Sequence, residues 1–304
     1  MRVGVLGRTS MLLRAARWLA DRGHEIAFVQ TCPPEPHYDA GESDFAQLAA
    51  EAGAPFIATR RVGDAVAAWR SSGAEVAISV NWPTLIGAEP LHALPYGVLN
   101  AHAGDLPRYR GNACPNWAIL NHELRVGLTI HRMTLDLDSG PWLYKTWRAI
   151  DETTYIGDVY AWLDRETPDA FAAALDRLAH PGFVDQDPSV RPLRTFPRRP
   201  SDARIDWSAD TRTVLALVRA SSHPFDGAFT TVDGADIVRV FEASQHAPDY
   251  DFCAVPGQVC FRLGADPVIA TADGMVVIKQ CGSEGRDSEE TKSFIAASLR
   301  NRLI

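Results

Sequence analysis

The chain has 304 residues, which is enough for two domains of ordinary size and too many for one small module. Apolar residues make up 46% and charged residues 22%, a mixture that excludes a wholly disordered chain. The formal net charge of −8 disfavours nucleic acid as a partner. No run approaches the roughly 20 apolar residues of a membrane-spanning helix, so no membrane partner is expected either.

Strands and helices are expected to alternate through the first hundred residues. Short apolar runs predict strands, and stretches with apolar residues at helical spacing that end in glycine predict helices. The expected strands are Arg2–Leu6, Glu25–Gln30, Pro55–Thr59, Glu75–Val80 and Gly97–His102, and the helices cover 11–23, 45–53 and 62–73. This order implies an α/β fold, with a parallel sheet, right-handed crossovers and helices on both faces.

The pattern changes beyond residue 125. Two alternating stretches, 125–136 and 141–151, predict strands that pair across a turn at Asp138–Pro141. A long helix is expected from about Ile156 to His180. The segment 181–204 holds five prolines and five arginines with no clear period, which is typical of a linker.

The remaining stretch opens with a predicted helix at Thr211–Ser222. Short runs with alternating apolar residues then predict strands at 227–232, 236–243, 257–261, 267–272 and 275–280. They indicate a small, mostly β domain, built as a barrel. We therefore predict three parts, namely a catalytic α/β domain at 1–185, a Pro/Arg-rich linker at 186–204 and a second domain at 205–304.

The turn after the first strand does not fit a dinucleotide site. It has only Gly4 and Gly7 where the fingerprint needs three glycines, and the second strand ends in Gln30 instead of an acid. The five cysteines are scattered without a CxxC pair, so neither a disulfide framework nor a zinc site is expected. A reducing cytoplasm fits this usage, and the first residues lack the pattern of a signal peptide.

The most informative stretch lies between residues 98 and 141. Asn100 and His102 are two apart at the end of a predicted strand, so their side chains leave the same face of the sheet. In an open parallel sheet, ligands bind beyond the carboxyl ends of the strands. A glycine- and proline-rich segment, 104–120, fits a loop over a site. Asp136 and Asp138 then precede a glycine turn. An Asp can stabilise a charged His, and an Asn amide can donate to an oxyanion, so these side chains suit acyl transfer.

The pattern of residues alone leaves a simpler interpretation open, because an N-x-H pair is also common at a polar strand end. His131 sits in mid-strand and is expected to be a core residue. Ser79 and Ser139 lack the surroundings of a nucleophilic serine. No His, Cys and Asp set has metal-ligand spacing, so no metal is expected.

Two connected runs, LNAHAGDLPRYRGNACPNWAILNHE (99–123) and VGLTIHRMTLDLDSGP (126–141), resemble the folate-dependent formyltransferases. That family carries an N-x-H-x-S-L-L-P-x-x-R-G loop and a later D-x-G-P/A turn. The resemblance covers nearly the whole chain and implies a Rossmann-like catalytic domain followed by a smaller OB-like domain, as in the methionyl-tRNA and amino-sugar branches. One departure is Asp105, which stands where the family usually has leucine.

The resemblance implies that Asn100, His102 and Asp138 take the places of the family's catalytic residues. It also implies N10-formyltetrahydrofolate as the formyl donor and no metal. Residues of two segments would surround the pterin ring of that donor: Trp82, Pro83, Thr84, Leu85, Ile86, Asp136 and Gly140. In the implied mechanism an amine attacks the formyl carbon, His102 and Asn100 stabilise the oxyanion, and Asp138 orients His102.

The amine that accepts the formyl group stays open among a nucleotide-linked amino sugar, methionyl-tRNA and a small amine such as hydroxyornithine. Hydrolysis of the donor and folate binding without catalysis are further hypotheses, and the complete Asn-His-Asp set argues against the last. The segment 31–51 holds five acids and no Lys or Arg, and 201–304 holds 15 acids against 10 bases, which disfavours tRNA. We therefore expect a nucleotide-linked amino sugar as the small-molecule substrate, and the family allows a homodimer.

Two groups of residues are expected near a phosphate of that substrate. Arg8, with Thr9 and Ser10, precedes the first helix, whose free N–H groups suit a phosphate or hydroxyl-rich ligand. Arg108 and Arg110 could pair with a diphosphate or simply anchor their loop. In the acidic segment, Glu42 and Asp44 are expected to face solvent.

Overall fold

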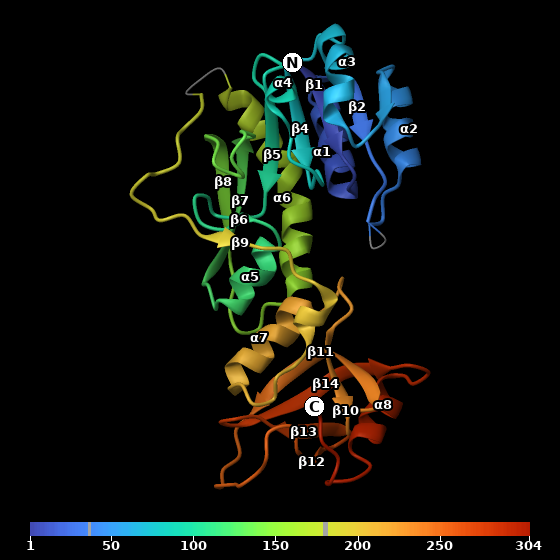
Figure 1. Ribbon diagram of the computed structural model, residues 1–304, viewed down its shortest axis with the longest axis vertical. Coiled ribbons are helices and arrows are strands. Elements are labelled where there is room, and N and C mark those ends of the chain that lie inside the picture. Colours follow the sequence, from blue (N-terminus) through green and yellow to red (C-terminus); the bar gives the residue numbers. More distant parts are fainter. Residues whose placement is uncertain (36–37, 179–181) are drawn as a thin grey trace. The chain divides into compact units, whose positions relative to one another are not determined.

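The structure, a computed structural model, describes residues 1–35, 38–178 and 182–304 (Figure 1). The chain forms two compact units. The N-terminal unit contains Met1–Cys114, Val126–Arg148 and Tyr160–Phe196, and the C-terminal unit contains Pro115–Arg125, Ala149–Val159 and Pro197–Ile304. Within the described ranges, no helix combines the length and apolar character needed to cross a bilayer.

The N-terminal unit is built on a seven-stranded sheet. In sheet order the strands are β3 (Phe56–Ala58), β2 (Glu25–Thr31), β1 (Arg2–Gly7), β4 (Val76–Val80), β5 (Val98–His102), β7 (Arg125–Arg132) and β8 (Trp142–Ala149). The first five are parallel, and β7 runs antiparallel to β5. The predicted parallel-rich α/β fold is confirmed, as are the five strands expected before residue 103.

The helices predicted in the first hundred residues are present. They are α1 (Ser10–Asp21), α2 (Glu42–Ala52), and the 3₁₀ helix η1 (Val62–Ala65) with α3 (Val66–Ser71), whereas the short helix α4 (Ala88–Leu91) was not predicted. Thr9 caps α1 by accepting from the Leu12 N–H, and Gly53 ends α2 in the left-handed conformation at φ 62°. On α3, Trp69 stacks on Phe28 with ring centroids 4.9 Å apart, which fixes this helix on the sheet.

The next two helices after β5 along the chain are α5 (Cys114–Leu120) and α6 (Ile156–Arg177). The long helix was expected to reach His180, and residues 179 and 180 lie outside the described residues. Asp44 does not simply face solvent, as the sequence predicts. It accepts a hydrogen bond from the Gly41 N–H at 2.7 Å and so caps α2, while Glu42 is exposed.

The C-terminal unit contains an antiparallel five-stranded sheet, which confirms the predicted mostly β second domain. Its order is β10 (Ala228–Val232), β11 (Asp236–His246), β14 (Met275–Ser283), β13 (Asp266–Ala270) and β12 (Val259–Leu263). The last residues join both edges, because the Thr231 N–H donates to the Ile304 carbonyl and the Leu303 N–H to the Gly257 carbonyl. This pairing brings the open sheet close to a barrel.

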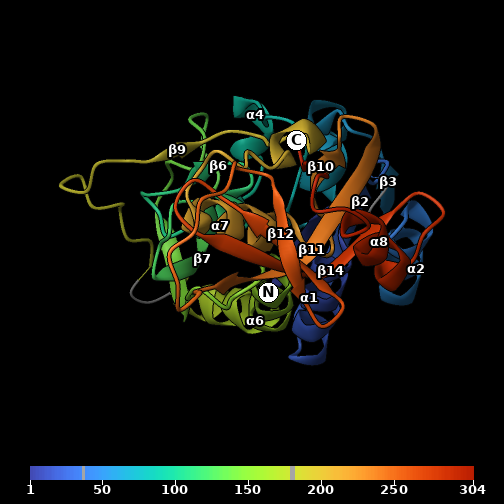
Figure 2. The ribbon, with the colours of Figure 1, turned by 90° about the horizontal axis from the view of Figure 1, so that it is seen from below.

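Two helices cover this sheet. The predicted helix is α7 (Thr211–Ser221), and it buries Val214 and Val218 in the core of the unit. An unpredicted helix, α8 (Ser288–Ile295), lies beside β14 in Figure 2 and buries Ile295 in the same core.

The segment predicted as a linker contains ordered elements. They are β9 (Arg194–Thr195) and the 3₁₀ helix η2 (Pro200–Ala203). β9 pairs with β6 (Arg110–Gly111), and the Arg110 N–H donates to the Leu193 carbonyl at 2.8 Å. A two-residue strand leaves no periodicity in the sequence, so pattern analysis could not detect it. Residues up to Phe196 therefore pack within the N-terminal unit.

Candidate active site

Strand β5 presents two polar side chains beside each other on one face of the sheet. Asn100 stands opposite Ser79 of β4 and His131 of β7, and His102 stands opposite Thr129 of β7. Both Asn100 and His102 are buried, with 8% and 6% of their surface exposed. Because β5 lies near the middle of the sheet, neighbouring strands hold these side chains on both sides.

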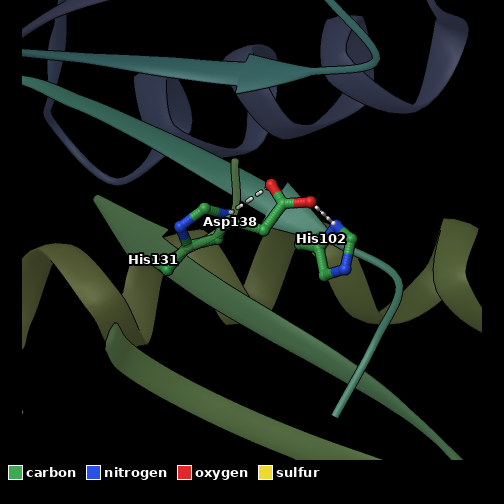
Figure 3. Close-up of side chains that lie close together, drawn as sticks. All are labelled: His102, His131 and Asp138. Atoms are coloured by element: carbon green, nitrogen blue, oxygen red, sulfur yellow. Dashed lines mark ion pairs between the residues drawn. The ribbon is translucent and has the colours of Figure 1, made fainter. Parts of the chain in front are cut away.

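Asp138 enters the site from the turn between β7 and β8. Its Oδ2 lies 3.6 Å from His102 Nδ1, and its Oδ1 lies 3.5 Å from His131 Nε2. Figure 3 shows the carboxylate between the two imidazole rings. The Gly111 N–H also donates to Oδ2 at 2.8 Å. The three residues predicted as catalytic are thus brought together, with His131 added to them.

The second ring nitrogen of His102 faces the loop that follows β5. His102 Nε2 lies 2.6 Å from the Tyr109 carbonyl oxygen and 3.7 Å from Cys114 Sγ. A Cβ on Gly104 would lie 2.6 Å from the same nitrogen, so a glycine here makes room for the ring. Both nitrogens of His102 therefore face oxygen acceptors, which suits an imidazolium with two N–H donors.

The charge states follow from these contacts. Burial disfavours the charged form of His102, yet the Asp138 carboxylate, Cys114 and the Tyr109 carbonyl together raise its pKa from 6.5 to about 9. Burial likewise opposes ionisation of Asp138, but His102 and His131 outweigh it and lower the Asp138 pKa. For His131 burial prevails and lowers the pKa. At neutral pH the site holds an imidazolium–carboxylate pair and a neutral His131.

The expectation that His131 is only a core residue is wrong. It is 1% exposed, and its Nε2 lies 3.4 Å from Asn100 Nδ2 as well as 3.5 Å from Asp138 Oδ1. At that nitrogen a neutral ring either accepts from the Asn100 amide or donates to Asp138. The missed signal was alternation, because His131 is two residues after Thr129 on a strand that pairs with β5.

The ligand atoms of His102, His131 and Asp138 lie within 4.8 Å of one another, a spacing that a metal ion could also use. The sequence did not predict this cluster, because two strands and a turn bring the residues together. A metal ion at this cluster would have to displace the proton of His102 that Asp138 stabilises. The expectation that no metal binds stays a prediction from the sequence.

A cleft of about 890 Å³ borders the turn that carries Asp138. Its lining comes from the α4 region and from the connection between β7 and β8: Leu91, His92, Ala93, Leu94, Pro95, Gly97, Arg132, Met133, Thr134, Leu135, Asp136 and Ser139. Asp138 lies between the lining residues Asp136 and Ser139. Gly140 follows directly, and a Cβ there would lie only 1.9 Å from the Arg132 carbonyl oxygen, so this turn requires glycine.

The other predicted pterin contacts follow β4. Ile86 is buried and Trp82 half-buried, and both pack in the cluster that contains Leu91. Pro83 is half-buried, and Thr84 and Leu85 are exposed. Among the residues that the structure describes, the lining of the cleft includes Asp136 but not Trp82, Pro83, Thr84, Leu85, Ile86 or Gly140.

Groups that could meet a phosphate have partners within the protein. Arg8 pairs with Glu35 at 2.9 Å, and Ser10 Oγ donates to Asp39 at 2.8 Å. Arg110 donates to the side-chain oxygen of Gln186. These contacts favour loop anchoring over phosphate binding for Arg110, and they do not support a phosphate site at the start of α1.

The unusual Asp105 has a cationic partner on β8. Lys145 Nζ lies 3.8 Å from Asp105 Oδ1 and also donates to the Leu106 carbonyl oxygen. The Lys145 side chain is only 12% exposed. The pair therefore anchors the loop after β5 to the edge of the sheet.

Two family models match this chain. One, described as formyl transferase, covers residues 1–175, and the other, described as formyl transferase, C-terminal domain, covers residues 198–299. The chain belongs to the formyl transferase family. The two matches confirm the resemblance of the sequence to the formyltransferases.

Solved structures share the fold of this formyl transferase. HypX from Aquifex aeolicus in complex with tetrahydrofolic acid matches with a TM-score of 0.64 and 21% identity, over 95% of this chain and 45% of HypX. The sugar 3N-formyl transferase WlaRD, in the presence of dTDP and 5-N-formyl-THF, matches with a TM-score of 0.64 and 12% identity, over 94% and 98% of the two chains.

An N-formyltransferase from Helicobacter canadensis, in complex with folinic acid and dTDP-3-aminofucose, matches with a TM-score of 0.68 and 12% identity, over 92% and 99% of the two chains. This formyl transferase thus spans less than half the length of HypX and nearly the whole length of the other two proteins. At these identities the likeness concerns the fold alone.

Proposed function

We propose that this enzyme transfers a formyl group from N10-formyltetrahydrofolate to the primary amine of a nucleotide-linked amino sugar. The observation that carries the proposal is the His102–Asp138 ion pair beside Asn100, at the carboxyl end of β5 and next to the cleft. The ligands of the structural neighbours support both the folate donor and the nucleotide-linked acceptor. One neighbour holds tetrahydrofolic acid, and two are described with formylated folates and with dTDP or a dTDP-sugar.

The volume of the cleft supports binding of a folate. Its volume of about 890 Å³ falls in the range of roughly 300–1,000 Å³ that small-molecule pockets occupy. Asp136 and the turn to Gly140 would hold the pterin on one side. The segment Trp82–Ile86 does not line the cleft itself, but Trp82 and Ile86 pack with the lining residue Leu91, so this segment would support the other side. When bound, the donor supplies an activated formyl carbon for attack by an amine.

The residues of the site can stabilise the negative charge that develops on the formyl oxygen. His102 would turn its Nε2–H from the Tyr109 carbonyl to that oxygen, and Asp138 would keep the ring protonated. The Asn100 amide, held beside His131, would donate a second hydrogen bond. As the new amide bond forms and the bond from the formyl carbon to N10 of the folate breaks, the acceptor nitrogen would lose one proton and N10 would gain one, so that tetrahydrofolate leaves.

Charge favours a small acceptor over tRNA. Three of the five acidic side chains in 31–51 have structural partners: Glu35 pairs with Arg8, Asp39 accepts from Ser10, and Asp44 caps α2. None of these contacts presents a positive surface to a polyanion. Methionyl-tRNA and a small amine such as hydroxyornithine remain the alternative acceptors.

The test is a panel of acceptors incubated with N10-formyltetrahydrofolate and read by mass. It includes dTDP- and UDP-linked amino sugars, methionyl-tRNA, hydroxyornithine and a water-only control. The proposal expects one nucleotide-linked amino sugar to gain a single formyl group. Exclusive formylation of methionyl-tRNA, or folate hydrolysis without any formylated product, would contradict it.

A further inference from the structure

Gln186 lies in the segment that the sequence predicts to be a linker, yet its side chain reaches the turn that carries Asp138. Its Nε2 donates to the carbonyl oxygens of Asp138, at 2.7 Å, and Gly140, at 2.9 Å. Its Oε1 accepts from Arg110 Nε at 3.2 Å and from Arg110 Nη2 at 2.6 Å. Both N–H groups and both lone pairs of the amide are therefore used.

Only an amide satisfies this arrangement. Two carbonyl oxygens stand on one side of the Gln186 side chain and a guanidinium on the other, so the orientation of the amide is fixed by its partners. A glutamate would have the same shape but would place an oxygen against the two carbonyls. A methionine would fill the same space without hydrogen bonds.

The turn that Gln186 holds has an unusual backbone. Asp138 is in the left-handed region at φ 50°, which is uncommon for a residue with a side chain. The direction of its carboxylate towards His102 depends on this conformation. The two hydrogen bonds from Gln186 are made to the carbonyl of Asp138 itself and to one two residues later, so they act directly on the backbone that aims the carboxylate.

The same segment also contacts Cys114, which lies on the opposite side of His102 from Asp138. Thr195 of β9 lies with its Oγ1 3.2 Å from Cys114 Sγ, and this sulfur is 3.7 Å from His102 Nε2. The segment from Gln186 to Thr195 thus contacts both the turn that carries Asp138, next to Nδ1 of His102, and the loop next to Nε2. Arg110 binds this segment twice, because its side chain donates to Gln186 and its backbone in β6 pairs with β9.

We propose that Gln186 is a positioning residue for formyl transfer, which sets the direction of the Asp138 carboxylate towards His102. The proposal rests on the proposed function, because it takes the His102–Asp138 pair as the working pair. Gln186 itself touches neither imidazole, so it acts through Asp138.

The test compares Gln186→Met and Gln186→Glu with Gln245→Glu, an exposed glutamine of β11 outside this network. Gln186→Met should lower kcat about 10- to 100-fold, because a small misplacement of a catalytic group can cost about a hundredfold. KM for the folate donor should change less than about threefold, since Gln186 does not line the cleft. Gln186→Glu should lower kcat at least as much, and Gln245→Glu should leave it unchanged.

A second readout needs no substrate. The ionisation of His102 is followed by NMR in the folded Gln186→Met protein, and its pKa should fall by about one unit as the carboxylate turns away, a tenfold change in the protonation equilibrium. The ionisable groups that face His102 are Asp138 from the turn, His131 from β7 and Cys114 from α5. None of them is altered in this variant.

Two outcomes would overturn the proposal. One is a folded Gln186→Met protein with the kcat and the His102 pKa of the wild type. The other is a lower melting temperature with an unchanged kcat per folded molecule and an unchanged pKa, which would make Gln186 a purely structural residue. The pKa of His102 is measured without donor or acceptor. It therefore tests the role of Gln186 even if the proposed transfer reaction is wrong.

Discussion

At the scale of the residue, His102 is held between opposing effects. It is almost fully buried, which alone would make the ring neutral, yet a buried carboxylate and a carbonyl oxygen face its two nitrogens. The ion pair prevails, and the ring stays charged at neutral pH. A charged imidazole in a site that excludes most water is a strong hydrogen-bond donor to a developing oxyanion.

The pKa of about 9 predicts a pH profile. The kcat/KM for the donor, which reports ionisation of the free enzyme, should be nearly constant from pH 7 to about 8.5 and should fall about tenfold per unit well above pH 9, because His102 loses its donating proton. Asp138→Asn removes the carboxylate that raises this pKa, so the fall should begin at lower pH. Initial rates at donor concentrations well below KM measure this, and a kcat/KM that rises through pH 9 would instead make His102 a general base.

The same pKa has a consequence for stability. The folded value lies above the ordinary 6.5, so the stabilisation from the charged ring is complete below about pH 6.5 and is lost as pH rises through about 9. Thermal unfolding of the wild type and of His102→Gln between pH 6 and 10 should show the difference between them shrinking. A difference that grows with pH would be inconsistent with this charge state.

At the scale of the element, the sequence predicted those strands and helices that have a regular spacing of apolar residues. Apolar runs and glycine ends located the five parallel strands and the first helices, and the motif located Asn100, His102 and Asp138. The parts it did not reveal depend on pairing between distant segments, as for β6 with β9 and for Gln186 with the turn at Asp138.

Helix α8 was missed for another reason. Its signal was present, because Asp287 and Glu290 form a capping box in which each side chain accepts from the backbone N–H of the other. The helix has only eight residues, which is too short for a clear periodicity of its own, and it follows a run of strands. The capping box is therefore the feature of the sequence that indicates it.

The loop after β5 gives a prediction at this scale. Lys145→Met leaves Asp105 partly buried without its cation and removes the donor to the Leu106 carbonyl, so it should lower kcat about tenfold and lower the melting temperature. Asp105→Leu combined with Lys145→Met replaces the pair by apolar groups, including the leucine that the family uses, and should recover much of the stability. A double variant less stable than Lys145→Met would contradict a role for this ion pair.

At the scale of the whole molecule, the chain joins an α/β unit that carries the candidate site to an antiparallel β unit, and both match formyl transferase domains. The net charge of −8 and the 15 acids against 10 bases in 201–304 favour a small acceptor over a polyanion in the proposed reaction. A homodimer and a cytoplasmic location stay predictions from the sequence.

Salt dependence tests the substrate class. With a nucleotide-linked sugar as acceptor, KM should change less than about tenfold between 50 and 200 mM salt, because few phosphates are neutralised; a tRNA with 6–10 phosphate contacts would lose roughly 10³–10⁵ in affinity. The exposed Glu42 offers a control, since Glu42→Lys should leave KM for the sugar nucleotide unchanged. A steep salt slope, or a large gain from Glu42→Lys, would favour the tRNA hypothesis.

The most direct measurement is the turnover of His102→Ala and Asp138→Asn beside the wild type, with saturating N10-formyltetrahydrofolate and the nucleotide-linked amino sugar, read as formylated product by mass. Circular dichroism and thermal unfolding establish that each variant is folded. The account predicts that turnover drops at least about a hundredfold in each, because each change removes charge stabilisation that is worth about 10²–10³ in rate. Near-normal turnover in either folded variant would contradict it.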